Sequence, residues 1–128
     1  MTNADLFRQQ AWLLVTISVL HALGLFLFLQ WQFWWYDIML HFMGGVWVAL
    51  AALWFYMKEG WVARMTTTVL IALSIGLGWE LFEYLVGSAR ESNYFYDTSL
   101  DILMDTLGAI AGFLYVYYRR VDEKEVLE

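Results

Sequence analysis

The chain has 128 residues, room for one domain, and 62% of them are hydrophobic while only 16% are charged. Soluble domains are nearer half apolar and a quarter charged, so this composition argues against an ordinary soluble protein. The formal net charge of −6 argues against nucleic-acid binding, and the lack of cysteine excludes disulfides and thiolate metal sites.

Long stretches of the chain contain no Asp, Glu, Lys or Arg. An apolar stretch of about 20 residues is long enough for a helix to cross the hydrocarbon core of a membrane. We therefore predict an all-α polytopic membrane protein, a bundle of four transmembrane helices that forms a single domain over residues 1–128. The helices are expected at about 8–30, 36–57, 62–86 and 97–119.

The connections between these segments differ in character. Residues 31–35 (WQFWW) are aromatic and fit a membrane interface. Residues 58–61 form a tight polar turn, and residues 87–96 form the longest connection. The short charged tail from Arg119 onwards is expected to fray into solvent.

The basic residues predict the orientation of the chain. On a four-span topology, one side receives six of the seven: Arg8, Lys58, Arg64, Arg119, Arg120 and Lys124. Only Arg90 falls on the other side. Because basic residues collect in cytoplasmic loops, we predict a membrane protein with both termini in the cytoplasm.

Acidic residues and a histidine gather at the opposite, outer ends of three of the predicted helices. They are Asp37 and His41, Glu80 and Glu83, and Asp97, Asp101 and Asp105. Spacings of three and four residues place each set on one helix face. A rise of ~1.5 Å per residue places His41, Glu80 and Asp105 in a deeper layer than the others. Charged side chains at membrane depth are usually functional.

These seven residues are predicted to form a divalent-metal site that faces the outer side of the membrane. A single arginine, Arg90, cannot balance six carboxylates, so bound cations or protons must do so. Carboxylates with an imidazole favour Mg²⁺, Mn²⁺, Ca²⁺ or Fe²⁺, and also accept Zn²⁺. His41 and Glu80 are the candidate catalytic residues, with His41 as a ligand or general base. Glycines on the same faces, such as Gly45, predict close helix packing below the site.

Simpler interpretations stay open for several of these residues. Asp37 and Asp97 are shallow enough to lie in the headgroup region. Glu83 is close enough in sequence to Arg90 for an ion pair. His21 is the other histidine of the chain, and it is either a packing residue or a member of the site. Trp79 is a candidate lining residue for a lipid.

The segments GWELFEYLVG (78–87) and DTSLDILMDTLGA (97–109) resemble the YjdF-type family of small bacterial inner-membrane proteins and, more distantly, the VanZ-like group. These families show D-x-x-x-H, E-x-x-E and D-T-x-x-D-x-x-x-D/N-x-x-G-A. The matching residues here are Asp37, His41, Glu80, Glu83, Asp97, Asp101, Asp105 and Gly108. The resemblance covers about residues 36–113. It supports the site without naming a reaction, although VanZ-like proteins are associated with glycopeptide-antibiotic resistance.

Three functions fit these observations, and we favour a metal-dependent hydrolase that acts on a lipid or lipid-linked substrate. The alternative is a divalent-cation or proton-coupled transporter, a channel subunit or a metal-binding sensor. The third is a structural metal that staples three helices together. Membrane lipids are the expected partners, a homo-oligomer is compatible with the chain, and whether the protein is an enzyme stays open.

Overall fold

The computed structural model describes residues 1–60, 62–87 and 93–125. Within these ranges every regular element is a helix, and four of the helices are long and apolar enough to cross a membrane. They are α1 (Asn3–Phe26), α3 (Trp34–Glu59), α4 (Met65–Val86) and α5 (Tyr94–Glu125), with a short helix α2 (Leu29–Gln32) between α1 and α3. The predicted all-α, four-span membrane bundle is confirmed.

The ends of the helices differ from the predicted bounds where capping or charged residues extend a helix. α1 begins at Asn3 rather than near residue 8, because Thr2 and Asp5 form a capping box that satisfies backbone N–H groups of the first turn. α5 runs on through the charged residues as far as Glu125 rather than fraying from Arg119. Its last residues, YRRVDEKE, include several good helix formers.

The aromatic connection is also more ordered than predicted. α1 ends at Phe26, and Phe28 takes a left-handed conformation with φ of 56°, which reverses the chain. α2 and the first turn of α3 then take up most of the expected loop at 31–35. The polar turn after α3 begins at Gly60, where φ of 69° suits a glycine at a helix C-cap. α4 begins at Met65 rather than at residue 62.

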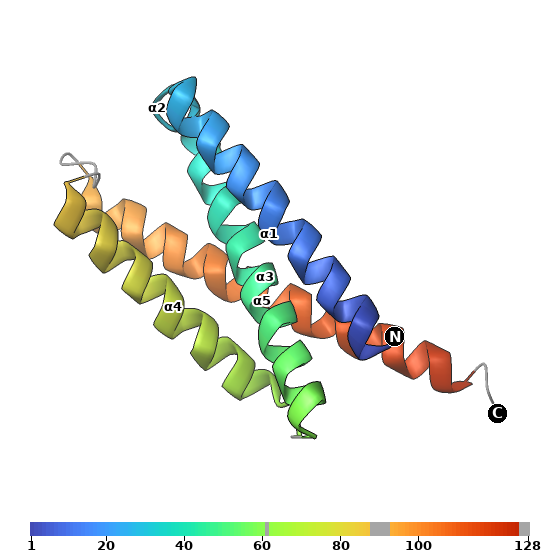
Figure 1. The fold of residues 1–128 in the computed structure, drawn as a ribbon. Helices are drawn as coiled ribbons and strands as arrows, with labels where there is room; N and C mark the ends of the chain where they lie inside the picture. Colours follow the sequence, from blue (N-terminus) through green and yellow to red (C-terminus); the bar gives the residue numbers. More distant parts are fainter. Residues whose placement is uncertain (61, 88–92, 126–128) are drawn as a thin grey trace.

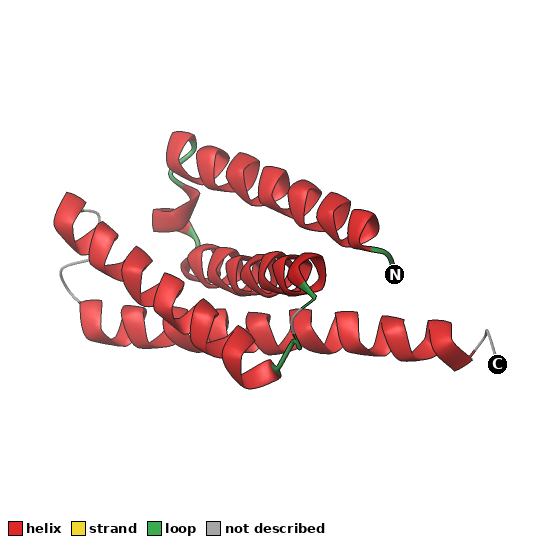
Figure 2. Ribbon diagram, turned by 60° about the horizontal axis from the view of Figure 1, so that its bottom comes forward, coloured by secondary structure: helices red, strands yellow, loops and turns green. Residues whose placement is uncertain are grey.

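α3 is the central helix of the bundle (Figures 1 and 2). α1 packs against α3 and α2, and α4 packs against α3 and α5. The most extensive helix pair is α3 with α5, which cross obliquely (Figure 1). The N- and C-terminal ends lie towards one side of the bundle, and α2 lies at the opposite side together with the last turn of α4 and the first turn of α5 (Figure 1). We call this opposite side the α2 side.

Glycines permit the close crossing of α3 and α5. A Cβ atom at Gly45 would overlap the backbone carbonyl of Asp105, and a Cβ atom at Gly108 would overlap the carbonyl of Phe42. A Cβ atom at Gly112 would lie only 3.0 Å from the carbonyl oxygen of Val46. Because small residues let membrane helices approach closely, these three positions define a seam along which the two backbones touch. The seam positions the acidic residues of α5 beside those of α3.

Candidate metal centre

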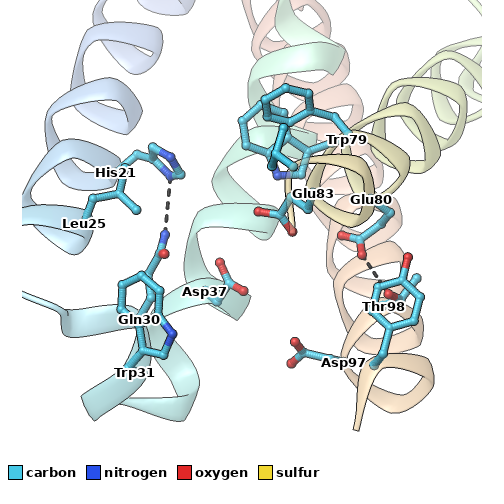
Figure 3. Close-up of a pocket in the computed structure, with 13 residues that line it drawn as sticks. His21, Leu25, Gln30, Trp31, Asp37, Trp79, Glu80, Glu83, Asp97 and Thr98 are labelled. Carbon is cyan, nitrogen blue, oxygen red and sulfur yellow. Dashed lines mark hydrogen bonds between the residues drawn. The ribbon is translucent and has the colours of Figure 1, made fainter. Parts of the chain in front are cut away.

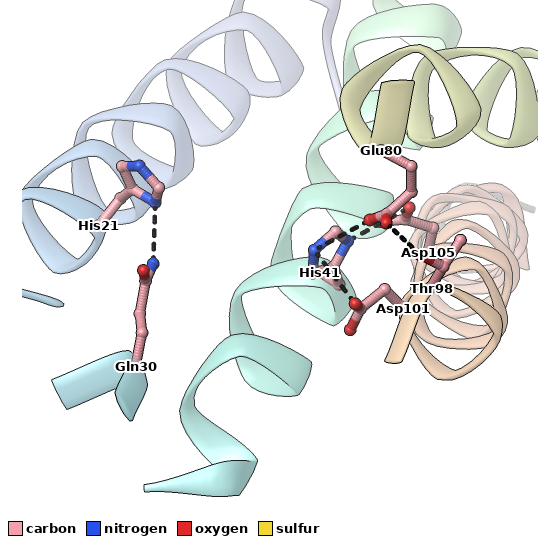
Figure 4. A network of polar contacts seen from close by, with 7 residues as sticks. All are labelled: His21, Gln30, His41, Glu80, Thr98, Asp101 and Asp105. Atoms are coloured by element: carbon pink, nitrogen blue, oxygen red, sulfur yellow. Dashed lines mark hydrogen bonds and ion pairs between the residues drawn. The ribbon is translucent and has the colours of Figure 1, made fainter. Parts of the chain in front are cut away.

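His41 of α3 lies at the centre of a buried polar cluster (Figure 4). Its ring is 7% exposed and is surrounded by carboxylates from α4 and α5. His41 Nε2 lies 3.7 Å from Glu80 Oε1 and 4.0 Å from Asp101 Oδ2. On the other side of the ring, His41 Nδ1 lies 3.4 Å from Asp105 Oδ2. Three membrane-spanning helices therefore meet at one imidazole.

The contact between Asp105 and His41 orients the imidazole ring. Metal-binding histidines commonly present one ring nitrogen to the metal and the other to a carboxylate, which fixes the tautomer. Asp105 faces Nδ1, and Nε2 faces Glu80 and Asp101. The geometry thus favours Nε2 as the ligand atom and Asp105 as a positioning residue, although the sequence placed Asp105 among the ligands.

A glycine on α4 makes room for this arrangement. A Cβ atom at Gly76 would overlap the carboxylate of Asp105, so any larger residue there would push that side chain away from His41. The Asp105 side chain thus lies between Gly76 of α4 and His41 of α3. Gly76 has ordinary helical backbone angles, so its role is one of space: it leaves room for the buried carboxylate of Asp105 between α3 and α4.

Among the described residues, two groups of side chains have ligand atoms close enough together to hold one metal ion. Asp37, His41 and Asp101 form one group, and His41, Glu80 and Glu83 form the other. Within each group the ligand atoms all lie within 4.8 Å of one another. Opposite ligands of one ion lie roughly 4–5 Å apart when metal–ligand distances are about 2.0–2.6 Å. Because His41 belongs to both groups, the two positions are adjacent or alternative rather than independent.

Two carboxylate oxygens of the centre are buried without a hydrogen-bond partner among the described residues. They are Glu80 Oε1 and Asp101 Oδ1, and their residues are 5% and 2% exposed. An unpaired buried charge costs several kcal/mol, so such groups are normally paired or coordinate a metal. The other oxygen of Glu80, Oε2, accepts a hydrogen bond of 2.7 Å from Thr98 Oγ1. One oxygen of Glu80 is therefore fixed by a hydrogen bond, and the other, which faces His41 Nε2 at 3.7 Å, can accept a cation or a proton.

A cavity of about 210 Å³ adjoins the centre from the α2 side (Figure 3). Its polar lining includes Asp37, Glu80, Glu83, Asp97 and Thr98. Asp37 and Glu83 also belong to the ligand groups, so they lie between the cavity and the buried residues. Asp97 lines the cavity but is in neither ligand group of the described residues. Its role as a metal ligand therefore stays a prediction.

His21 lies apart from the ligand groups, on α1. Its Nδ1 is 3.4 Å from Gln30 Nε2 on α2 (Figure 4). Its ring makes an edge-type contact with Trp79 at a centroid distance of 5.9 Å. Both His21 and Trp79 line the cavity of Figure 3. The structure therefore places His21 in the cavity wall, where sequence reasoning had left its place open. The expected partner of Glu83, Arg90, lies outside the described residues.

Thr98 and Gln30 were missed by sequence reasoning. Thr98 stands between Asp97 and Asp101 in the chain, and a hydroxyl within an acidic helical motif was the signal that could have found it. Gln30 lies in an aromatic stretch that predicted only an interface, so nothing nearby in sequence marked it as a partner of His21.

We expect Thr98→Val to weaken metal binding, because it removes the donor to Glu80 Oε2 and leaves that carboxylate free to turn. Loss of an outer partner of a metal ligand typically costs 10–100-fold in affinity, so a decrease of roughly tenfold is expected. Titration of the purified protein with Mn²⁺, followed by electron paramagnetic resonance, measures it. Thr98→Ser keeps the hydroxyl and should restore the affinity, whereas equal losses in both variants would contradict this role.

The chain was compared with known proteins at the level of families, curated proteins and solved structures. Neither the search of curated proteins nor the search of solved structures found a match. A family profile described as "Predicted membrane protein (DUF2238)" matches residues 3–122. The resemblance to YjdF-type proteins is consistent with this family, and the more distant resemblance to the VanZ-like group stays a prediction. Because the match covers all four membrane-spanning helices, the chain belongs to the DUF2238 family of predicted membrane proteins.

Proposed function

We propose that this membrane protein binds a divalent cation at His41 and its surrounding carboxylates and uses it to hydrolyse a lipid or lipid-linked substrate. The observation that carries the proposal is a pair of carboxylate oxygens, Glu80 Oε1 and Asp101 Oδ1, that are buried beside His41 and have no hydrogen-bond partner among the described residues. Oxygen and imidazole donors at this spacing suit Mg²⁺, Mn²⁺, Ca²⁺, Fe²⁺ or Zn²⁺.

The residues around the site have distinct roles in this proposal. A bound divalent ion supplies polarisation of a phosphoryl or carbonyl oxygen and lowers the pKa of water. Glu80, held at Oε2 by Thr98, would accept the proton of the attacking water at Oε1 and return it to the leaving oxygen as the ester or phosphoester bond breaks. Asp105 holds the ring of His41 so that Nε2 points at the ligand groups. The cavity on the α2 side admits water and the polar part of the substrate.

The packing below the site favours a binding or catalytic role over transport. A divalent-cation or proton-coupled transporter needs a path from the acidic cluster to the other side of the membrane. Below His41, the path along α3 and α5 meets the seam at Gly45, Gly108 and Gly112, where the two backbones touch. A cation at His41 would therefore exchange with the α2 side through the cavity that adjoins it.

The proposed location is a bacterial inner membrane with the α2 side facing outwards. Described basic residues support this orientation, because Arg8, Lys58, Arg64, Arg119 and Arg120 all belong to the helix ends opposite the α2 side. The hydrolysed bond would then lie in the outer leaflet.

Elemental analysis of the detergent-purified protein beside a Glu83→Gln, Asp101→Asn double variant tests the metal site. Each substitution removes the charge of one candidate ligand from one of the two groups. The affinity for metal should therefore fall by roughly 10–100-fold, and less metal should remain bound. Glu59→Gln is the matched control, because it removes a carboxylate from the far end of α3 and should keep the metal. Ligands must lose their protons to bind metal, so wild-type affinity should also fall as the pH is lowered.

Wild-type protein without metal, even after addition of Mg²⁺, Mn²⁺, Ca²⁺, Fe²⁺ and Zn²⁺ in turn, would overturn the proposed centre. Hydrolysis is tested with vesicles of phosphatidylethanolamine and phosphatidylglycerol, by measuring free fatty acid and water-soluble phosphate. Glu80→Gln should abolish product formation while the protein stays inserted and folded. If metal-loaded wild type forms neither product, the hydrolase is contradicted and the metal site stands alone.

A further inference from the structure

A second cavity, of about 290 Å³, lies between α1 and α4 with α3 as its floor. Its walls come from residues such as Leu14 and Ile17 of α1 and Ala72 and Ile75 of α4. α1 and α4 lie on opposite sides of α3 and each packs against α3 (Figures 1 and 2). The space between them is lined by side chains of all three helices, and Gly44 of α3 has no side chain that would fill it. We call it the α1/α4 cavity.

The α1/α4 cavity presents an apolar surface with a single polar end. The hydroxyl of Ser18 donates to the carbonyl of Leu14 at 2.8 Å, and the indole N–H of Trp47 donates to Gln10 at 3.0 Å. These lining groups are satisfied within the protein. The other polar groups at the cavity include His21, which contacts Gln30 at 3.4 Å, and His41 and Asp105, which belong to the metal centre. An occupant would thus be apolar along most of its length and meet the metal centre at one end.

The position of the cavity along the helices identifies the medium that fills it. Leu14, Ile17 and Ser18 lie near the middle of α1, and Ala72 and Ile75 lie near the middle of α4. The middle of a membrane-spanning helix lies in the hydrocarbon core, where lipid alkyl chains surround the protein. An apolar cavity of 150 Å³ holds a benzene ring, so the α1/α4 cavity has room for an alkyl segment of roughly ten carbons.

The α1/α4 cavity and the cavity on the α2 side meet at shared wall residues. His21 and Trp79 line both, and their rings are in edge contact at 5.9 Å. The cavity on the α2 side carries several carboxylates among apolar side chains, including Glu80 and Glu83, whereas the α1/α4 cavity is mostly apolar and ends at His41. The two cavities together therefore match an amphiphile, with a polar head on one side of the metal centre and an alkyl chain on the other.

We propose that the α1/α4 cavity binds the alkyl chain of a membrane lipid that enters sideways between α1 and α4 and places its headgroup at the metal centre. This inference deepens the proposed function and rests on it for the role of the headgroup. The chain-binding part rests only on the cavity itself.

The test uses phosphatidylglycerol with a nitroxide near the end of one acyl chain, in vesicles of phosphatidylethanolamine and phosphatidylglycerol. Electron paramagnetic resonance should show a saturable, immobilised component of one lipid per protein. Ile75→Trp fills the cavity and should reduce this component to the background of lipids around the bundle. Leu81→Trp is the matched control: Ile75 is 49% and Leu81 57% exposed, both are on α4, and Leu81 is not part of the cavity lining.

Metal content is measured on the same samples, so that failure of the metal centre can be distinguished from failure of the alkyl-chain site. Ile75→Trp should lose the immobilised lipid and keep its metal. A wild type without the saturable component, or an Ile75→Trp variant that keeps it, would overturn the alkyl-chain site. If Leu81→Trp also lost the immobilised component, the spin label would be reporting lipid around the bundle, and this result would also overturn the alkyl-chain site. A wild type that immobilises lipid but binds no metal would overturn the metal centre and the role of the headgroup, and would leave the alkyl-chain site standing.

Discussion

Replacing His41 with alanine is expected to abolish metal binding. His41 is the one residue common to both ligand groups of the described chain, so its loss removes a ligand from each. It also leaves Glu80, Asp101 and Asp105 without the imidazole that all three face. We expect a loss of affinity of roughly 100-fold or more, because removal of an outer partner alone costs 10–100-fold. Mn²⁺ titration and elemental analysis of the purified variant measure it.

His21→Ala serves as the comparison, because it removes the other imidazole of the chain and lies in neither ligand group. Its metal content should equal that of the wild type. Helical content by circular dichroism shows whether His41→Ala stays folded, and His41→Gln keeps a polar side chain of similar size if the alanine variant does not. Stoichiometric metal in a folded His41 variant, or equal losses at both histidines, would contradict the assignment of the centre.

Gly108→Ala is expected to destabilise the bundle, although replacing glycine with alanine inside a helix usually stabilises a protein. Its new Cβ atom would overlap the carbonyl of Phe42 and lie 3.0 Å from Val46 N, both backbone atoms of α3. Backbone atoms within a helix cannot change rotamer to relieve an overlap as side-chain atoms can. α5 must therefore move away from α3. Overpacking of this kind costs about 1–3 kcal/mol and should lower the midpoint of thermal unfolding in detergent.

Gly78→Ala is the matched control, because a Cβ atom there has no atom of the described chain within 4 Å. Removing a glycine from a helix interior stabilises by roughly 0.5–1 kcal/mol, so this variant should have a raised midpoint. The two glycine-to-alanine changes are therefore expected to act in opposite directions. Metal affinity should also fall in Gly108→Ala, since movement of α5 separates Asp105 from His41. A raised midpoint in both variants would show that the seam is looser than described.

The membrane-spanning helices, and the helix faces that carry the candidate site residues, could be predicted from local patterns. Uncharged apolar length determines whether a helix can cross a membrane, and that property is read from neighbouring residues alone. The same holds for the spacing of Asp101 and Asp105, which places them on one face of α5. Helix ends were predicted less well, because the capping box at Thr2 and the short α2 depend on local geometry that composition does not express.

The partners of each site residue were decided by tertiary structure. Nothing in the spacing of Asp105 distinguishes a ligand from a residue that orients His41, and only the crossing of α3 and α5 places it at Nδ1. Thr98 donates to Glu80 only because α4 packs beside α5. His21 lines the cavity on the α2 side only because α1 places it beside Trp79.

The sequence by itself thus determined an all-α, four-span membrane protein with acidic residues and a histidine near one end of three of its helices, because hydropathy and helical periodicity are local properties. The close contact along the glycine seam, the division of the site into candidate ligands and candidate positioning residues, and the cavity between α1 and α4 came only from tertiary structure. The physical reason is that these features depend on how closely and at what angle helices distant in sequence pack.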